Sequence, residues 1–225
     1  MQRSGSCKDK DEIVFFNQAI SERASDCTVA MPVKELRVPF SIRLASDHDL
    51  DPAADTLAAA FEDYAWTKFV IPEQNYRERL HALQRLYLTH ALTHGVVVVA
   101  GDISGVAALL PATASEPGPT MIEEVVALHG DRIGRLDSGL PQTSNADAWA
   151  LETLGVAPAA QGLGIGSALI KAAVREVQTH GGKLIRLETS DERNVQLYLR
   201  HGFEVTGQVT GTNGPPSWAM QLELS

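Results

Sequence analysis

Residues 161–167 read Gln161-Gly-Leu-Gly-Ile-Gly-Ser167, between an apolar run at 150–156 and a helical pattern at 167–180. This order predicts a strand, a glycine-rich turn and a helix. The first turn of a helix presents backbone N–H groups without internal partners, together with the positive end of the helix dipole. Such a turn binds anions, and glycines let an anion approach because no Cβ stands in the way. The stretch therefore predicts a phosphate-bearing ligand near residue 161.

Two common phosphate-binding motifs do not fit the spacing of these glycines. The dinucleotide fingerprint G-x-G-x-x-G would need its third glycine at position 167, whereas the chain has Gly166. That fingerprint also usually opens its domain, and here the turn comes late in the chain. A P-loop needs Lys and then Ser or Thr after its last glycine, but Gly166 is followed by Ser167-Ala168. A turn whose glycines serve only packing remains the alternative from this stretch alone.

The sequence after the turn narrows the choice. Residues 183–189 alternate like a short strand, and residues 190–203 have the pattern of a capped short helix that ends at Gly202. Asn194 and Tyr198 lie four residues apart and therefore share one face of that helix. The chain thus carries Q-x-x-G-x-G followed by N-x-x-x-Y-x-x-x-G-F.

This pair of motifs resembles the GNAT superfamily of acyl-CoA N-acyltransferases. The resemblance implies an α/β (α+β) fold with a mixed, mostly antiparallel sheet of about seven strands and helices on both faces. The hydrophobic patterns agree with that order of elements. They predict strands at 40–44, 96–100, 105–110, 149–156, 183–189, 204–210 and 218–224, helices at 50–61, 73–93, 121–128, 167–180 and 190–203, and loops at 113–119 and 137–147.

The resemblance narrows to puromycin N-acetyltransferase-like proteins. It is carried by Arg43-Leu44-Ala45, Thr56-Leu-Ala-Ala-Ala-Phe61 with Asp63-Tyr64, Gln161-Gly-Leu-Gly-Ile-Gly-Ser-Ala168, Leu187-Glu-Thr-Ser190, Arg193-Asn194, Gly202-Phe203 and Gly214-Pro215-Pro216 with Trp218. It fades over residues 113–148, where such enzymes vary to fit their acceptor. Residues 1–38 are polar and match nothing in the family, so we expect a flexible N-terminal extension (1–38) before an acetyltransferase domain (39–225). Met31 is a candidate for the true start.

Composition limits the classes of function. The chain has 225 residues, 44% of them hydrophobic, which suits one domain with a full core. A net charge of −9 argues against nucleic acid as a main partner. Cys7 and Cys27 have neither metal-ligand spacing nor a disulfide framework, so we expect no metal and a cytoplasmic location. No run is long and apolar enough to predict a membrane span, and a homodimer remains open.

For the acyl donor, the resemblance implies acetyl-CoA, with longer acyl groups left open. Its pyrophosphate would lie on the backbone N–H groups of the glycine turn, and its pantetheine arm would pair like a strand with residues 154–156. Asn194 would hold the pantetheine amide. The implied cofactor-binding residues are Leu154, Gly155, Val156, Gln161, Gly162, Leu163, Gly164, Ile165, Gly166, Ser167 and Asn194.

Two side chains are candidates for proton transfer. Tyr198 is the candidate general acid, because a phenol with a pKa of about 10 is protonated at neutral pH and can protonate a leaving thiolate. Glu152, in the strand expected to line the cleft, is the candidate general base, although a bulge could turn it to the other face. Glu188 is the next candidate. The histidines form no triad pattern; His129, His180 and His201 are expected at the surface or at helix ends.

The acceptor site is expected between the first two helices, residues 113–148 and the last hairpin. Its candidate walls are Trp66, Phe69, Tyr76 and Trp218, and Glu62 and Asp63 could attract a cationic amine. The expected activity is acetyl transfer from acetyl-CoA to the primary amine of a small molecule, by direct attack in a ternary complex. A peptide or protein N-acetyltransferase and a non-catalytic acyl-CoA sensor remain alternatives.

Overall fold

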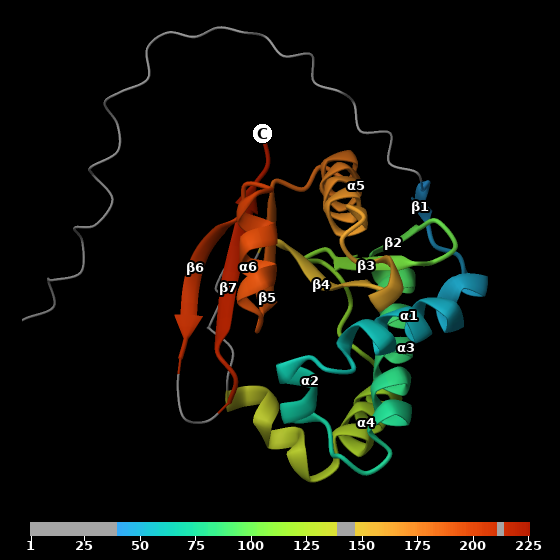
Figure 1. Ribbon diagram of the computed structural model, residues 1–225. Coiled ribbons are helices and arrows are strands. Elements are labelled where there is room, and N and C mark those ends of the chain that lie inside the picture. Colours follow the sequence, from blue (N-terminus) through green and yellow to red (C-terminus); the bar gives the residue numbers. More distant parts are fainter. Residues whose placement is uncertain (1–39, 139–146, 211–213) are drawn as a thin grey trace, which may run out of the picture. The chain divides into compact units, whose positions relative to one another are not determined.

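The computed structural model describes residues 40–138, 147–210 and 214–225 (Figure 1). The expected extension at 1–38 and most of the expected loop at 137–147 lie outside these ranges. The strands are β1 (Ile42–Leu44), β2 (Val96–Ala100), β3 (Gly105–Leu110), β4 (Trp149–Val156), β5 (Leu184–Thr189), β6 (Glu204–Val209) and β7 (Ser217–Glu223). The helices are α1 (Leu50–Phe61), α2 (Ala65–Val70), α3 (Tyr76–His94), α4 (Pro119–His129), α5 (Ile165–Thr179) and α6 (Glu192–Leu199), with 3-10 turns η1 (Asp47–Asp49), η2 (Gly130–Ser138) and η3 (Pro158–Ala160).

The strands form a 7-stranded sheet in the order β1-β2-β3-β4-β5-β7-β6. Every neighbouring pair is antiparallel except β4 and β5, which run parallel. The parallel pair arises because α5 connects β4 to β5 as a crossover helix. The predicted mixed, mostly antiparallel sheet is therefore confirmed.

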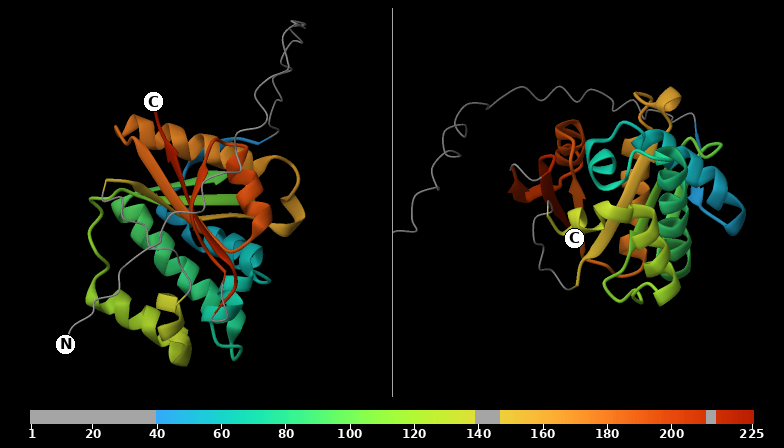
Figure 2. Two further views of the ribbon diagram at one scale, coloured as in Figure 1. Left: turned by 90° about the vertical axis from the view of Figure 1, so that its left-hand side faces the viewer. Right: turned by 90° about the horizontal axis from the view of Figure 1, so that it is seen from below.

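Helices cover both faces of the sheet, as Figure 2 shows from the side. Along β2, successive side chains point to opposite faces of the sheet and pack against different helices. Val96 and Val98 pack in a cluster with Leu169 and Ile170 of α5, whereas Val97 and Val99 pack with Leu57 of α1 and with α3. All five residues of β2 are buried, which explains its unbroken apolar sequence.

Helix α2 and the three 3-10 turns of the described residues were not predicted. The sequence of α2, Ala65-Trp-Thr-Lys-Phe-Val70, is short and rich in aromatic and β-branched residues, which favour helix only weakly. Tertiary contacts stabilise it instead. The Thr67 hydroxyl lies 2.8 Å from the Phe61 carbonyl oxygen, and Val70 packs with Leu80 and Leu83 in a separate cluster between α1, α2 and α3.

A capping box formed by Ser46 and Asp49 precedes α1. The Ser46 backbone N–H donates to the Asp49 carboxylate at 2.8 Å, and Arg43 donates to both Asp49 oxygens at 2.7 Å. The hydrogen bond from Arg43 is the main reason that the pKa of Asp49 lies well below its usual range.

The predicted helix at 73–93 begins later, at Tyr76, because Asn75 adopts the left-handed conformation with φ 54°.

Candidate active site

Strands β4 and β5 separate after a short parallel contact. They pair only at Trp149 with Ile185 and at Ala150 with Arg186. Beyond these pairs β4 stays bonded to β3 as far as Val156, while β5 stays bonded to β7. The edge of β4 that faces β5 is therefore free of strand partners from Leu151 onward within the described part of the chain.

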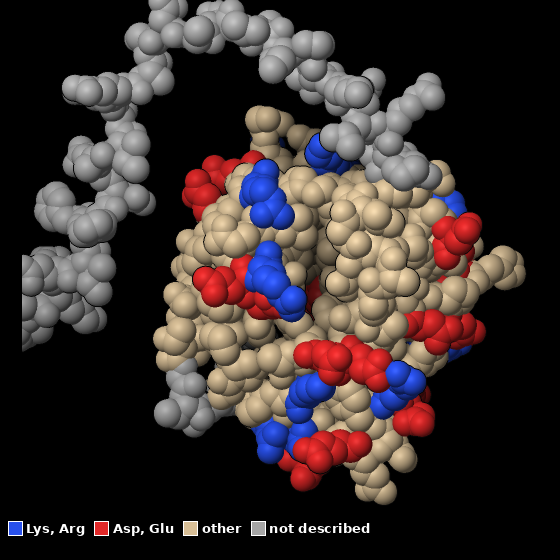
Figure 3. Space-filling view, in the orientation of Figure 1, with Lys and Arg blue, Asp and Glu red and all other residues tan. Residues whose placement is uncertain are grey.

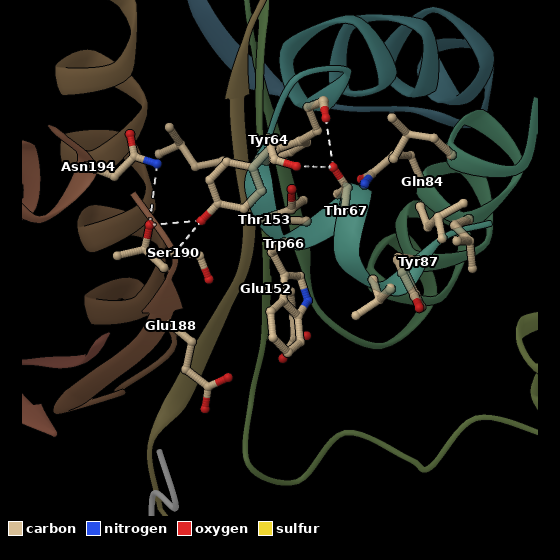
Figure 4. Close-up of a pocket in the computed structure, with 18 of the residues that line it drawn as sticks. Tyr64, Trp66, Thr67, Gln84, Tyr87, Glu152, Thr153, Glu188, Ser190 and Asn194 are labelled. Atoms are coloured by element: carbon tan, nitrogen blue, oxygen red, sulfur yellow. Dashed lines mark hydrogen bonds between the residues drawn. The ribbon is translucent and has the colours of Figure 1, made fainter. Parts of the chain in front are cut away.

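A cavity of about 350 Å³ adjoins this separation and extends between the sheet and helices α1, α2 and α3. Figure 4 shows Asn194, Ser190 and Glu188 at one end of it and Gln84 and Tyr87 at the other. Four of the predicted site residues line it: Glu152, Leu154, Asn194 and Tyr198. The next candidate base, Glu188, lines it as well.

A β-bulge directs Glu152 into the cavity. Leu151 pairs with Leu109 and Thr153 pairs with Ala108, so Glu152 is the extra residue of β4. Its side chain is exposed, but it is exposed to the cavity, where protein surrounds it on most sides. The sequence left the direction of Glu152 open because of such a bulge, and the structure shows that the bulge places the carboxylate at the site.

The two carboxylates of the cavity are shifted toward the protonated form. Burial raises the pKa of Glu152, and the charge of Arg186 opposes the shift. Burial also raises the pKa of Glu188, with Arg186 opposing and Glu152 reinforcing it. On the helical side of the cavity, burial and then the Glu152 charge raise the pKa of Tyr87 to about 12. A carboxylate with a raised pKa holds a proton more readily near neutral pH, which suits a general base.

Helix α6 places Asn194 and Tyr198 on one face, as their spacing predicted. The helix begins at a cap in which the Asp191 carboxylate accepts from the Arg193 N–H at 2.8 Å. Asn194 donates from Nδ2 to the Thr189 hydroxyl at 3.3 Å. Tyr198 is only 7% exposed and packs on Phe203 with 5.4 Å between ring centroids. Burial raises the pKa of Tyr198, so its phenol keeps its proton at neutral pH.

Tyr64, in the link between α1 and α2, was not predicted as a site residue. Its hydroxyl accepts a short hydrogen bond from the Ser190 backbone N–H and lies 3.1 Å from the Thr189 hydroxyl. Because Thr189 also accepts from Asn194, Tyr64 connects the helical side of the cavity to the start of α6 (Figure 4). The sequence contains Tyr64 within the resemblance, but nothing local indicates a contact with a residue more than a hundred positions away.

The glycine turn lies outside the cavity wall. None of residues 161–167 lines the cavity, and neither do Gly155 and Val156. Gly162 and Gly164 have φ of 78° and 86°, a conformation that glycine adopts without strain. Helix α5 begins at Ile165, and its cap, Gly164, has no side chain to accept from the first-turn N–H groups. Those groups therefore remain available to an anion, as the sequence predicted for the turn.

Side-chain contacts hold the turn in place. Gln161 donates from Nε2 to the Val156 carbonyl oxygen at 3.1 Å, which ties the turn to the end of β4. The Ser167 hydroxyl lies 3.0 Å from Nε2 of His201. Burial, and then the charges of Lys171 and Arg200, lower the pKa of His201. Two cations thus lie near the start of α5, although the turn itself contains none.

Several residues expected at the acceptor site lie elsewhere. Of the four aromatic candidates, Trp66 lines the cavity, and Phe69, Tyr76 and Trp218 do not. Phe69 packs under Arg135, and the Tyr76 hydroxyl lies 2.9 Å from that of Thr67. The two acids proposed to attract an amine are already paired. Glu62 accepts from Arg77 and Asp63 from Lys68, each at 2.6 Å.

The opening of the site carries mixed charge. Figure 3 shows a hollow near the middle of this face, bordered by basic as well as acidic side chains. In the described ranges no cluster of His, Cys, Asp and Glu could hold a metal ion, and no helix there is long and apolar enough to cross a membrane.

Two further polar residues of the cavity were missed. His129, expected at the surface or at a helix end, is the last residue of α4 and is only 2% exposed. Gln84 of α3 is 8% exposed. Both line the cavity. Their sequence patterns resemble those of solvated helix residues, so only the packing of α2 and α4 against α3 identifies them.

Comparison with known proteins supports one family. The sequence model described as "Acetyltransferase (GNAT) domain" matches residues 120–205. A Corynebacterium glutamicum structure described as "histone acetyltransferase HPA2 and related acetyltransferase" is 26% identical, with 83% of this chain and 97% of that chain covered and a TM-score of 0.65.

Two more distant structures share the fold. Arylalkylamine N-acetyltransferase 2 from Aedes aegypti is 16% identical, with a TM-score of 0.57 over 83% of this chain and 99% of that one. A GNAT-family protein from Desulfovibrio desulfuricans is 22% identical, with a TM-score of 0.51 over 83% and 99%. The narrower resemblance to puromycin-type enzymes stays a prediction. The sheet order, the separated β4 and β5 and the matched segment together support a GNAT-type acetyltransferase domain in this chain.

Proposed function

We propose that the protein transfers an acetyl group from acetyl-CoA to the primary amine of a small molecule, by direct attack in a ternary complex. One observation carries the proposal. A single cavity beside the free edge of β4 brings together a carboxylate with a raised pKa, Glu152, and a protonated phenol, Tyr198. An acceptor amine must lose a proton and a departing thiolate must gain one, and these two groups match those needs.

The residues present fit acetyl-CoA on structural grounds. The unpaired edge of β4 offers backbone groups to an extended chain, as in β-augmentation. The uncapped start of α5 offers N–H groups to a pyrophosphate. Asn194, on the cavity wall, offers an amide side chain to the pantetheine arm. When bound, acetyl-CoA would supply the activated acyl group.

The protein's own side chains then divide the work. Glu152 accepts the proton of the incoming amine, directly or through water, and Glu188 is a second carboxyl group in the same cavity. Tyr198 donates its proton toward the sulfur position. Walls from α1, α2 and α3 exclude bulk water, which strengthens these interactions. A cavity of about 350 Å³ favours a small acceptor over a peptide segment.

The first test is binding. Isothermal titration with acetyl-CoA, free CoA and NADH should give binding of the two CoA species and none of NADH. Binding of NADH alone, or of none of the three, would refute the proposal.

The second test is turnover, measured as thiol release with a panel of amines. Tyr198→Phe should keep acetyl-CoA binding and lose about 10²–10⁴-fold in turnover, the usual contribution of a positioned acid. Glu152→Gln should also keep acetyl-CoA binding and lose turnover. Its turnover rate should increase less steeply with pH than that of the wild type. Full turnover in both variants would remove the assigned roles, and CoA binding without turnover on any amine would favour a sensor.

A further inference from the structure

The end of the cavity farthest from the proposed acyl site contains polar groups that the proposed mechanism does not use. In Figure 4 Gln84 and Tyr87 lie at this end, with Trp66 and Glu152 between them and Asn194. His129, from the end of α4, lines the same cavity. Among the residues that line the cavity, two buried side-chain atoms have no hydrogen-bond partner: Oε1 of Gln84 and Nε2 of His129.

The chemical character of the His129 nitrogen can be derived. Its Nδ1 lies 2.8 Å from the Val70 carbonyl oxygen. A carbonyl can only accept, so Nδ1 carries the proton. Burial lowers the pKa of His129, which keeps the ring neutral. Nε2 therefore presents a lone pair, and it can only accept a hydrogen bond.

Gln84 also carries an acceptor atom that has no donor. The carbonyl oxygen of its side chain is an acceptor without a partner, and the residue is only 8% exposed. Buried polar atoms in folded proteins are almost always hydrogen-bonded, and exceptions mark an absent water, ion or ligand. Two such acceptors on residues that line one cavity call for a partner that donates.

Much of the remaining cavity wall is apolar. It includes Phe61, Trp66, Leu80, Leu83 and Leu136. The whole cavity measures about 350 Å³, and the proposed acyl donor takes up its Asn194 end. The space that is left suits a compact amine with a ring-sized body rather than a large, branched antibiotic.

We propose that the acceptor is a compact amine whose ring-sized apolar body carries a hydrogen-bond donor, such as a hydroxyl, at the end opposite the amine. The amine lies at Glu152, and the donor reaches the acceptors of Gln84 and His129. This inference rests on the proposed function and specifies its substrate class.

Matched amines provide the test. Tyramine has the donor, 2-phenylethylamine lacks it, and 4-methoxyphenylethylamine replaces it with an acceptor. Each is titrated into the full-length protein with CoA present, and each is assayed for thiol release with acetyl-CoA. Tyramine should bind more tightly and show the higher kcat/KM, by roughly tenfold or more, because the other amines leave buried acceptors unpaired. Equal binding of the three amines would overturn the proposal.

The variant Gln84→Leu separates recognition from folding. It removes an unpartnered buried acceptor and keeps an apolar side chain of similar length, so its Tm should not fall. The ratio of kcat/KM for tyramine to that for 2-phenylethylamine should fall toward one, mainly because tyramine binds more weakly. The control Gln74→Leu lies on an exposed turn and should leave the preference unchanged. A preference that survives Gln84→Leu would overturn the assignment.

The two proposals fail in different ways. Acetylation of all three amines at equal rates would remove the donor requirement and leave the acetyltransferase standing. Loss of all thiol release would remove the acetyltransferase, while the amine titrations would still report the preference directly.

Discussion

Gly155 of β4 is expected to tolerate no side chain at all. A Cβ built there would lie 2.7 Å from Cδ2 of Leu57 and 3.1 Å from Cβ of Ala60. Real Cβ atoms essentially never come within 3.0 Å of such a neighbour. Leu57 is fully buried between α1 and the sheet, so it has little room to move. Gly155→Ala must therefore push α1 away from β4.

The cost follows from known overpacking effects. An extra methyl in a well-packed core destabilises by about 1–3 kcal/mol. For a domain of this size each 1 kcal/mol lowers Tm by roughly 2–4 °C, so Tm of Gly155→Ala should fall by about 4–8 °C for a loss of about 2 kcal/mol. Thermal unfolding followed by circular dichroism measures the shift, and urea titration should show a lower midpoint with an unchanged slope.

A second glycine provides the control. A Cβ at Gly134 would meet nothing within 4 Å, so Gly134→Ala should leave Tm within about 1 °C of the wild type, as for most surface substitutions. An unchanged or raised Tm in Gly155→Ala would refute the packing argument, since Leu57 would then be free to yield. A fall in both variants would point to a general sensitivity of the fold rather than to this contact.

Three further predictions concern the turn, the first helix and the link at Tyr64. Gly164→Ala should weaken acetyl-CoA binding, measured by titration, because φ is 86° at residue 164. Gly166→Ala should retain binding, because the added Cβ would point inward at ordinary contact distance. An equal loss of acetyl-CoA binding in the two variants would contradict this. Asp49→Asn should lower Tm at neutral pH and make the stability of the protein depend less on pH on the acid side. The reason is that the lowered pKa of Asp49 stabilises the folded state above about pH 3.9, and this contribution is lost as the pH falls. Parallel curves of stability against pH for the variant and the wild type would refute it. Tyr64→Phe should destabilise by about 1–3 kcal/mol in urea unfolding, since the buried Ser190 N–H loses its acceptor, and an unchanged midpoint would remove that contact's role.

The sequence predicted the sheet and the helices that have strong periodic patterns. The ranges 96–100 and 105–110 match β2 and β3, and the spacing of Asn194 and Tyr198 placed both on one face of α6. These features are local: a run of valines or a four-residue spacing determines them within one element. The glycine turn was likewise identified from its own residues and the helix behind it.

The acceptor end of the cavity could not be predicted in the same way. Gln84, His129 and Tyr64 are polar residues in or beside helices, and such residues are usually solvated. They become cavity residues only because α2 and α4 pack against α3, and α2 itself has a sequence of weak helix propensity. Conversely, Phe69 and Tyr76 are used in contacts within the helical layer, which their residue types alone do not reveal.

The bulge at Glu152 links the packing of β4 to its chemistry. Before the bulge, the odd-numbered residues Trp149 and Leu151 face α5. After it, the even-numbered residues Leu154 and Val156 face α5, because the extra residue shifts the alternation by one position. Gly155 can then face Leu57 on the other side, where only glycine fits. Without the extra residue the alternation would place Gly155 toward α5 and larger side chains against α1. The same inserted residue thus permits the close approach of α1 and directs a carboxylate into the cavity, so the stability of β4 and the position of the candidate base depend on one feature.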